Sequence, residues 1–321
     1  MITLSDLERA SAIVYRAMPP TPQYVWPLIA REAGCELWVK HENHTPTGAF
    51  KVRGGLTHMA LRKARGEING VITATRGNHG QSIPFAARRV GISTTVVVPL
   101  GNSPEKNAAM RALGAELIET GTDFDAAREA AARIGRERGL DFIASFGPEL
   151  VMGVATYAKE LFDAAGALDA VYVPIGMGSG ICSVIVVRDL LGLKTEVIGV
   201  SAANANAYAL SFAAGKPVAT NASATFADGM AVRIPNPDAF AIIKAGAERV
   251  VEVSEDEIAT AMRLYYTGAH TVAEGAGAGA LAALLKERAR MAGKRVGVIL
   301  SGGNIDMDKF SSVLQGKTPA A

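Results

Sequence analysis

The chain has 321 residues, of which 49% are hydrophobic and 20% charged, and its formal net charge at neutral pH is +2. This composition is sufficient for two compact domains and excludes a disordered or fibrous protein. The basic residues are spread along the chain without a block, so we expect no nucleic-acid partner.

The first residues predict a helix rather than a leader sequence. Ser5 and Glu8 have the spacing of a capping box, and no basic stretch leads into an apolar one. The apolar runs 171–180 and 296–300 are far shorter than the ~20 residues that a membrane-spanning helix needs. The two cysteines are expected to be buried packing residues. We therefore predict a cytoplasmic protein without a signal peptide or membrane segment.

Short β-branched runs alternate with helical patterns along most of the chain. This alternation is typical of βα units that form a mainly parallel sheet. The expected strands are 36–40, 70–73, 94–99, 116–119, 170–174, 196–200, 249–253 and 295–300. The expected helices include 104–113, 124–138, 151–165, 255–267 and 276–291. Ser254 and Glu257 form a second capping box, which predicts the start of the helix at 255.

One lysine, Lys51, stands where a helix should begin, after a turn rich in Pro, Thr and Gly. Residues 41–55 read His-Glu-Asn-His-Thr-Pro-Thr-Gly-Ala-Phe-Lys-Val-Arg-Gly-Gly. An amine in this position can point into a cleft, which is what a Schiff base requires. The run therefore marks Lys51 as a candidate catalytic residue.

Two further runs each follow a predicted strand and open a helix. Residues 75–81 read Thr-Arg-Gly-Asn-His-Gly-Gln, and residues 174–180 read Pro-Ile-Gly-Met-Gly-Ser-Gly. Backbone N–H groups at a helix N-terminus bind anions, and glycines let the backbone approach a phosphate closely. A dinucleotide site is disfavoured, because Ile181 replaces the third glycine of that fingerprint.

Together these runs resemble those of pyridoxal-phosphate (PLP) enzymes of fold type II, the tryptophan-synthase β family, in the serine/threonine dehydratase and serine racemase branch. The resemblance implies two α/β domains, each with a mainly parallel twisted sheet flanked by helices, and PLP in the interdomain cleft. It places a small inserted domain at 63–148 and a large PLP-binding domain at 1–62 and 149–321. It leaves no room for the C-terminal regulatory domain of biosynthetic threonine deaminases, and it suggests a homodimer.

The resemblance also assigns candidate site residues. Lys51 would form the Schiff base with PLP and take the substrate's α-proton. The cofactor-binding candidates are Lys51, Phe50, Asn78, Gly176, Met177, Gly178, Ser179, Gly180, Glu274 and Ser301. The substrate-binding candidates are Thr75, Arg76, Gly77, Asn78, His79 and Asp228.

Some of these roles stay open on the sequence alone. In the family, the asparagine contacts the ring hydroxyl of PLP and the serine contacts the pyridine nitrogen. Glu274 matches an acidic residue near the ring and equally fits a carboxylate at a helix N-terminus. Asp228, before a glycine, is also an ordinary turn signal. His41 and His44 depart from the family motif and are interpreted as structural histidines.

The implied reaction is α,β-elimination, which converts a 3-hydroxy amino acid of the threonine or serine type to a 2-keto acid and ammonia. Family racemases carry a serine as second base where this chain has Arg76. An arginine stays protonated near neutral pH, so racemisation is disfavoured. Two interpretations of Arg76 stay open: its guanidinium reads the β-substituent, for example the second carboxylate of 3-hydroxyaspartate, or it turns outward and reaches solvent.

Other functions remain as alternatives. They are a phenylserine dehydratase, a dehydratase of a hydroxyectoine-type pathway and a PLP-binding protein without turnover. Cation-dependent relatives bind a divalent ion with acidic residues after the strand that corresponds to 196–200. Residues 201–207 contain no carboxylate, so we predict no metal site there.

Overall fold

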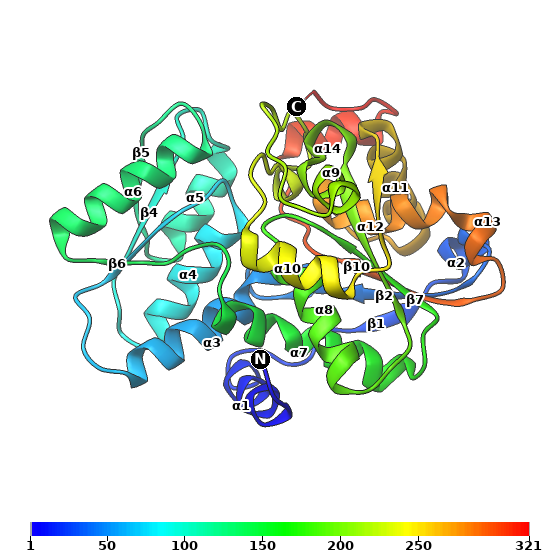
Figure 1. Ribbon diagram of the computed structural model, residues 1–321. Helices are drawn as coiled ribbons and strands as arrows, with labels where there is room; N and C mark the ends of the chain where they lie inside the picture. Colours follow the sequence, from blue (N-terminus) through cyan, green and yellow to red (C-terminus); the bar gives the residue numbers. More distant parts are fainter. Residues whose placement is uncertain (1, 321) are drawn as a thin grey trace. The chain divides into compact units, whose positions relative to one another are not determined.

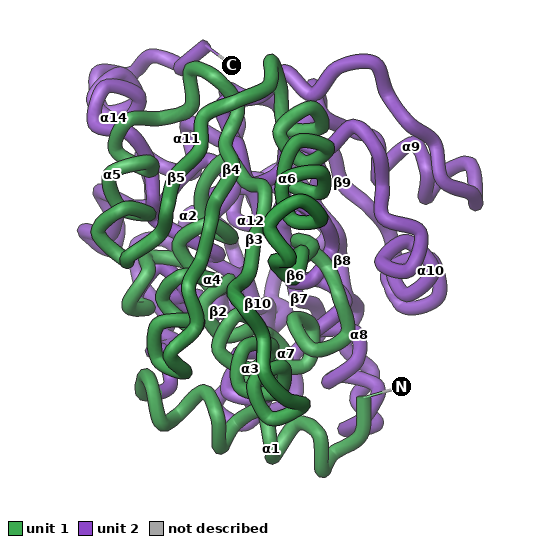
Figure 2. Tube along the Cα trace, turned by 90° about the vertical axis from the view of Figure 1, so that its left-hand side faces the viewer, with its two compact units in different colours: residues 1–19, 45–156 green, residues 20–44, 157–321 purple. Residues whose placement is uncertain are grey.

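The computed structural model describes residues 2–320 and divides into two compact units, which Figure 1 and Figure 2 show. The first unit comprises residues 1–19 and 45–156, and the second comprises residues 20–44 and 157–321. Each unit is built around its own sheet, of four strands in the first and six in the second. The fold class is therefore α/β, with parallel-sheet units flanked by helices, as predicted.

The sheet of the first unit is wholly parallel. Its strand order is β5 (Glu116–Glu119), β4 (Thr94–Val98), β3 (Val71–Ala74) and β6 (Asp141–Phe142). The helices of this unit are α1 (Leu4–Val14), α3 (Lys51–Ala64), α4 (Asn78–Arg89), α5 (Pro104–Ala112), α6 (Phe124–Arg138) and the start of α7 (Pro148–Ala165).

Helices cover both faces of β3, which explains why the strand is apolar and fully buried. Val71 belongs to a core with residues of α3 and α4, whereas Ile72 and Ala74 pack with residues of α6. Successive strand residues point to opposite faces of a sheet. A strand with helices on both sides therefore needs a continuous apolar run rather than alternation.

The sheet of the second unit has one antiparallel edge strand. Its order is β1 (Gln23–Val25), β2 (Glu36–His41), β10 (Arg295–Leu300), β7 (Ala170–Pro174), β8 (Glu196–Ala202) and β9 (Arg249–Val253). β1 pairs antiparallel with β2, and the other neighbours are parallel. The loops after β2, β7 and β10 therefore leave the sheet at the same edge, where ligands bind in open parallel sheets.

Helices also flank the sheet of the second unit. They are the end of α7, α2 (Pro27–Ala33), α8 (Ser179–Leu190), α9 (Ala207–Ala214), α10 (Pro237–Gly246), α11 (Glu255–Ala269), α12 (Gly275–Lys286), α13 (Arg288–Met291) and α14 (Met307–Leu314). Three short 3₁₀ turns are η1 (Glu42–His44), η2 (Ala203–Ala205) and η3 (Asp228–Met230). α12 is buried from Gly275 to Leu284 and packs on β7, β8, β9 and β10, which makes it the central helix of this core.

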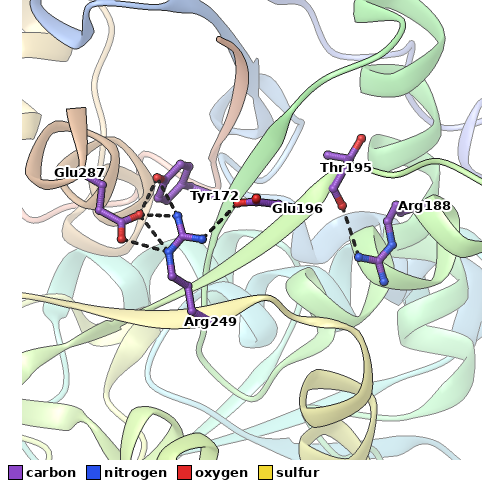
Figure 3. Close-up of polar contacts among 6 residues, drawn as sticks. All are labelled: Tyr172, Arg188, Thr195, Glu196, Arg249 and Glu287. Atoms are coloured by element: carbon purple, nitrogen blue, oxygen red, sulfur yellow. Dashed lines mark hydrogen bonds and ion pairs between the residues drawn. The ribbon is translucent and has the colours of Figure 1, made fainter. Parts of the chain in front are cut away.

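A charged network closes the end of α12 onto the sheet (Figure 3). Arg249 donates from Nη2 to Glu287 Oε2 at 2.7 Å and from Nη1 to Glu196 Oε2 at 3.1 Å. The Tyr172 hydroxyl donates to Glu287 Oε2 at 2.6 Å. Burial would lower the pKa of Arg249, but the hydrogen bonds that it donates to Glu287 and Glu196 raise the pKa, so the guanidinium stays charged. Removing Arg249 would leave the partly buried Glu287 carboxylate without this ion pair.

The eight predicted strands are confirmed within two residues at each end. The sequence missed β1 and β6, which are only 3 and 2 residues long. The predicted helix 276–291 is divided at Glu287 into α12 and α13. The Ser254–Glu257 capping box is confirmed, with hydrogen bonds of 2.7 and 3.1 Å.

The predicted cap of the first helix is wrong. The N-cap residue is Thr3, whose hydroxyl accepts from the Asp6 amide at 3.2 Å, while the Asp6 carboxylate accepts from the Thr3 amide at 3.0 Å. Ser5 already lies inside α1. Thr-x-x-Asp and Ser-x-x-Glu overlap here, and the pair that stands two residues earlier forms the box.

The predicted domain limits remain a prediction. The four-stranded sheet, from Val71 to Phe142, lies within the proposed insertion 63–148, while the compact first unit also includes 1–19 and 45–62. Both cysteines are buried and unpaired, as predicted, and burial raises the pKa of Cys35 to about 11. Within residues 2–320, no helix is both long and apolar enough to cross a membrane.

Candidate functional site

Lys51 is the first residue of α3, and the turn before it is held in place by Thr45. The Thr45 hydroxyl accepts from the Ala49 amide at 2.9 Å and donates to the Ala49 carbonyl at 2.8 Å. Lys51 Nζ lies 3.5 Å from the Ser145 carbonyl oxygen and 5.2 Å from the centroid of the Phe50 ring. Burial lowers the pKa of Lys51 to about 8. A larger share of this amine is therefore unprotonated and nucleophilic near neutral pH than in an ordinary lysine.

The loop 75–77 joins β3 to α4 in the same unit. The Thr75 amide donates to the Val97 carbonyl at 3.1 Å, and the Thr75 hydroxyl accepts from the Gly77 amide at 3.0 Å. α4 begins at Asn78 without a side-chain cap, and the amides of a helix's first turn have no intrahelical acceptor. The Gly77 amide already donates within the loop. An anion at this end would therefore be bound by the first-turn amides of α4 and by the positive end of the helix dipole.

His79 is a buried, neutral histidine. Its exposed fraction is 5%, and burial, with a smaller contribution from Lys51, lowers its pKa to about 3. Its Nε2 atom is buried and has no hydrogen-bond partner among the described residues. The charge of His58 in α3 also lowers the pKa of His79 slightly. His58 Nδ1 itself lies 2.8 Å from Glu149 Oε2. This state fits a hydrogen-bonding role for His79, which stays a prediction.

Two cations lie at the loop 75–77, Arg76 within it and Lys106 beside it. Arg76 is exposed, whereas Lys106 on the first turn of α5 is only 9% exposed. A Cβ added to Gly77 would stand 3.2 Å from Lys106 Cδ, so the lysine stem lies directly against the loop. Lys106 is not among the site residues predicted from the sequence. The sequence points to Lys106 only through Ser103 and Pro104, which start α5. This helix follows β4, the strand that pairs with β3.

The glycine loop of the second unit needs its glycines for two different reasons. Gly178 precedes α8 with φ of +98°, a conformation that strains any residue with a side chain. A Cβ on Gly176 would collide with the carbonyl oxygen of Gly229. The loop therefore combines a left-handed turn with close backbone approach.

Two tyrosines hold the carbonyl groups of this loop. The Tyr157 hydroxyl donates to the Gly180 carbonyl at 2.9 Å, and the Tyr208 hydroxyl donates to the Met177 carbonyl at 3.3 Å. These hydrogen bonds fix the peptide planes of Met177 and Gly180. The first-turn amides of α8 are then available to an anion, as in a phosphate nest. Neither tyrosine was predicted from the sequence, since a tyrosine in an apolar helix has the same pattern as any other core residue.

The remaining candidates of the second unit lie at the carboxyl edge of its sheet. Ser301 follows β10 directly and is 4% exposed. Glu274 precedes α12 and is 7% exposed; its amide donates to the Gly302 carbonyl at 3.0 Å, and its side chain makes no capping hydrogen bond. Asp228 opens η3, and the following Gly229 would place a Cβ 3.8 Å from Glu274 Oε1.

The structure thus brings the candidates together in two groups. The lysine site of the first unit consists of Phe50, Lys51 and residues 75–79. The glycine-loop site of the second unit consists of residues 176–180, Asp228, Glu274 and Ser301. Across residues 2–320, no three His, Cys, Asp or Glu side chains gather in a way that could hold a metal ion.

Comparison with known proteins gives a family match. The family model described as pyridoxal-phosphate dependent enzyme matches residues 14–302. An L-threonine ammonia-lyase of Thermotoga maritima is 34% identical over 315 residues, which cover 98% of this chain and 78% of that protein. An L-threo-3-hydroxyaspartate ammonia-lyase of Saccharomyces cerevisiae is 29% identical, with 98% of this chain and 97% of that protein covered.

The fold has a close counterpart among solved structures. The processed form of threonine deaminase isoform 2 from Solanum lycopersicum superposes with a TM-score of 0.91 at 28% identity. The match covers 97% of this chain and 92% of that one. The likeness extends over almost the whole of both chains.

Proposed function

Because this chain belongs to the family of pyridoxal-phosphate dependent enzymes, we propose that it is an ammonia-lyase that converts a 3-hydroxy amino acid of the threonine or serine type to a 2-keto acid and ammonia. The observation that carries the proposal is Lys51, a half-buried lysine at the start of α3 whose pKa is lowered to about 8. The threonine and hydroxyaspartate ammonia-lyases among its relatives support the same reaction class.

The residues present fit PLP. Lys51 supplies the amine that binds the cofactor's aldehyde. The loop 176–180 turns at the left-handed Gly178 into the N-terminus of α8, whose first-turn amides would hold the cofactor's phosphate. Ser301 supplies a neutral hydroxyl for the ring nitrogen, and such a group does not hold that nitrogen protonated as an aspartate would. When bound, PLP withdraws electrons from the substrate and makes its α-proton acidic.

The protein's own groups would bind the substrate and accept its α-proton. The first-turn amides of α4 bind the substrate's carboxylate and orient the amino acid. The Lys51 amine accepts the α-proton as general base, because it is partly unprotonated near neutral pH. The β-hydroxyl then leaves, and hydrolysis of the resulting enamine gives the keto acid and ammonia.

Arg76 supports a narrower substrate class as the second candidate. The Arg76 guanidinium, an exposed group within the loop 75–77, can pair with a second carboxylate, and Lys106 adds positive charge against Gly77. 3-Hydroxyaspartate has this second carboxylate, and a relative is named for acting on it. Phenylserine and hydroxyectoine-derived substrates remain alternatives. Racemisation is less favoured, because Arg76 cannot serve as a second base.

The proposal is tested by release of keto acid from a panel of amino acids. The panel comprises threonine, serine, 3-hydroxyaspartate and 3-phenylserine, each as separate stereoisomers, with alanine as the control that lacks a leaving group. We expect turnover of at least one hydroxy amino acid and none of alanine. PLP binding without keto-acid release from any member would favour the non-catalytic alternative instead. A homodimer in the cytoplasm also belongs to the proposal, and size-exclusion chromatography with light scattering tests the dimer.

A further inference from the structure

The Tyr208 hydroxyl lies between the glycine loop and the start of α10. Tyr208 belongs to α9, and only 2% of the residue is exposed. Its hydroxyl donates to the Met177 carbonyl at 3.3 Å and accepts from the Asn236 amide at 3.1 Å. Burial raises the pKa of Tyr208, so the hydroxyl keeps its proton at neutral pH. One oxygen atom therefore joins two backbone groups that are distant in the sequence.

The start of α10 also packs directly against the glycine loop. Asn236 is the N-cap residue of α10, and its side chain accepts from the Ala239 amide at 3.0 Å. A Cβ added to Gly178 would stand 2.7 Å from Ala239 Cβ and 3.5 Å from the Tyr208 hydroxyl oxygen. Cys182 Sγ of α8 lies 3.6 Å from the Ala239 carbonyl oxygen. The first turns of α8 and α10 are therefore neighbours, and the Tyr208 hydroxyl lies beside both.

The segment 215–236, which joins α9 to α10, touches the glycine loop at two places. It contains η3, to which Gly229 belongs, and a Cβ on Gly176 would collide with the Gly229 carbonyl oxygen. The two backbones are therefore in direct contact there. At its end, the same segment is tied to Met177 through the Tyr208 hydroxyl. A shift of the loop at either place must therefore also shift this segment.

The peptide between Met177 and Gly178 needs an external contact to fix its orientation. Gly178 has φ of +98° and no Cβ, so rotation of this peptide meets little steric resistance. The peptide is trans, and its carbonyl and amide therefore point in opposite directions. By holding the Met177 carbonyl, the Tyr208 hydroxyl turns the Gly178 amide away from itself. In a nest, such an amide binds an anion together with those of the helix's first turn.

We propose that Tyr208 is a positioning residue for anion binding by the glycine loop, because its hydroxyl orients the peptide between Met177 and Gly178 and ties it to the start of α10. The identity of the anion as the phosphate of PLP rests on the proposed function. A hydroxyl suits this place because it donates to a carbonyl and accepts from an amide at the same time. The coupling is reciprocal, so an anion that fixes the loop also orders the end of the segment 215–236.

Tyr208→Phe removes the hydroxyl and keeps the ring. The matched control is Tyr265→Phe, because Tyr265 is also buried in the second unit and its hydroxyl has no hydrogen-bond partner among the described residues. PLP and pyridoxal, which lacks the phosphate, are titrated separately into each apoprotein. We expect Tyr208→Phe to weaken PLP about tenfold and pyridoxal less than about threefold, since the variant disturbs only the loop that holds the phosphate. Tyr265→Phe should leave both affinities unchanged.

Hydrogen exchange with inorganic phosphate as the probe gives a second readout, which does not depend on the chemistry of PLP. Phosphate added to the unmutated apoprotein should slow exchange about threefold or more in the peptide that contains residues 229–236. In Tyr208→Phe the same addition should leave exchange in this peptide unchanged, because the link between the loop and the Asn236 amide is lost.

An equal loss of affinity for PLP and pyridoxal in Tyr208→Phe would overturn the proposal, because a general loss of structure would then explain it. Unchanged PLP affinity, or the same loss in Tyr265→Phe, would overturn it as well. Should Tyr208→Phe fail to fold, Ala239→Val crowds Gly178 without removing the hydroxyl and is expected to weaken PLP more than pyridoxal; an equal loss or none would overturn the proposal. Absence of keto-acid release from the unmutated protein would overturn the proposed function and leave the phosphate result standing.

Discussion

The lysine site and the glycine-loop site use different physical means. In the lysine site, burial acts on titratable side chains and lowers the pKa of Lys51 to about 8 and of His79 to about 3. In the glycine-loop site, close packing acts on the backbone, as the carbonyl of Gly229 beside Gly176 and the left-handed Gly178 show. Substitutions in the first should change chemistry with little effect on the fold, whereas substitutions in the second should change cofactor binding through backbone geometry.

Lys51→Ala should have the largest effect. Loss of both the Schiff-base amine and the general base should lower keto-acid release at least ~10³-fold and abolish the visible absorption band of the cofactor. The fold should be retained, because the contact between Nζ and the Ser145 carbonyl in the first unit is long, at 3.5 Å. Circular dichroism and keto-acid assays measure both outcomes. Activity above about a tenth of the unmutated level would contradict the chemical role assigned to the lysine site.

Gly176→Ala tests whether backbone geometry governs cofactor binding in the glycine-loop site. The added Cβ would meet the Gly229 carbonyl, so the loop must shift, and we expect PLP affinity to fall roughly 10- to 100-fold. Gly147→Ala in the first unit is the control, since its Cβ would meet nothing within 4 Å. PLP titration into each apoprotein measures the difference. Equal affinity of the two variants would show that backbone geometry does not govern the glycine-loop site.

Arg76→Ala should have a smaller effect that depends on the substrate. Loss of a charge-assisted pair should lower kcat/KM for 3-hydroxyaspartate about 10- to 100-fold and for threonine less than about threefold. Arg76→Lys keeps the charge but loses the planar fork and should fall between the two. A loss of the same size on both substrates would exclude recognition of a second carboxylate.

The smallest effect is a dependence of stability on pH. The pKa values of His79 and His41 are lowered in the folded state, so the unfolded chain binds more protons between pH ~6.5 and ~4. Stability should therefore fall as the pH falls through this range, by up to about 1.4 kcal/mol per pH unit for each histidine. Urea unfolding at several pH values measures the slope, and His79→Asn and His41→Asn should each flatten it. An unchanged slope would mean that burial does not keep these rings neutral.

Local patterns made the main strands and the Lys51 turn predictable, because they depend on residues close in the sequence. β1 and β6 escaped prediction because strands of 3 and 2 residues have no periodicity of their own. Tyr157 and Gly229 depend on contacts with Gly180 and Gly176, which are distant in the sequence.

The central claim is that Lys51 carries the cofactor of this enzyme. Mass spectrometry of the holoprotein after borohydride reduction and proteolysis tests it most directly, because reduction makes the bond between PLP and its lysine permanent. We predict a phosphopyridoxyl group on the peptide that contains Lys51 and on no other lysine peptide. Modification of a different lysine, or none at all in a protein that has bound PLP, would contradict the claim.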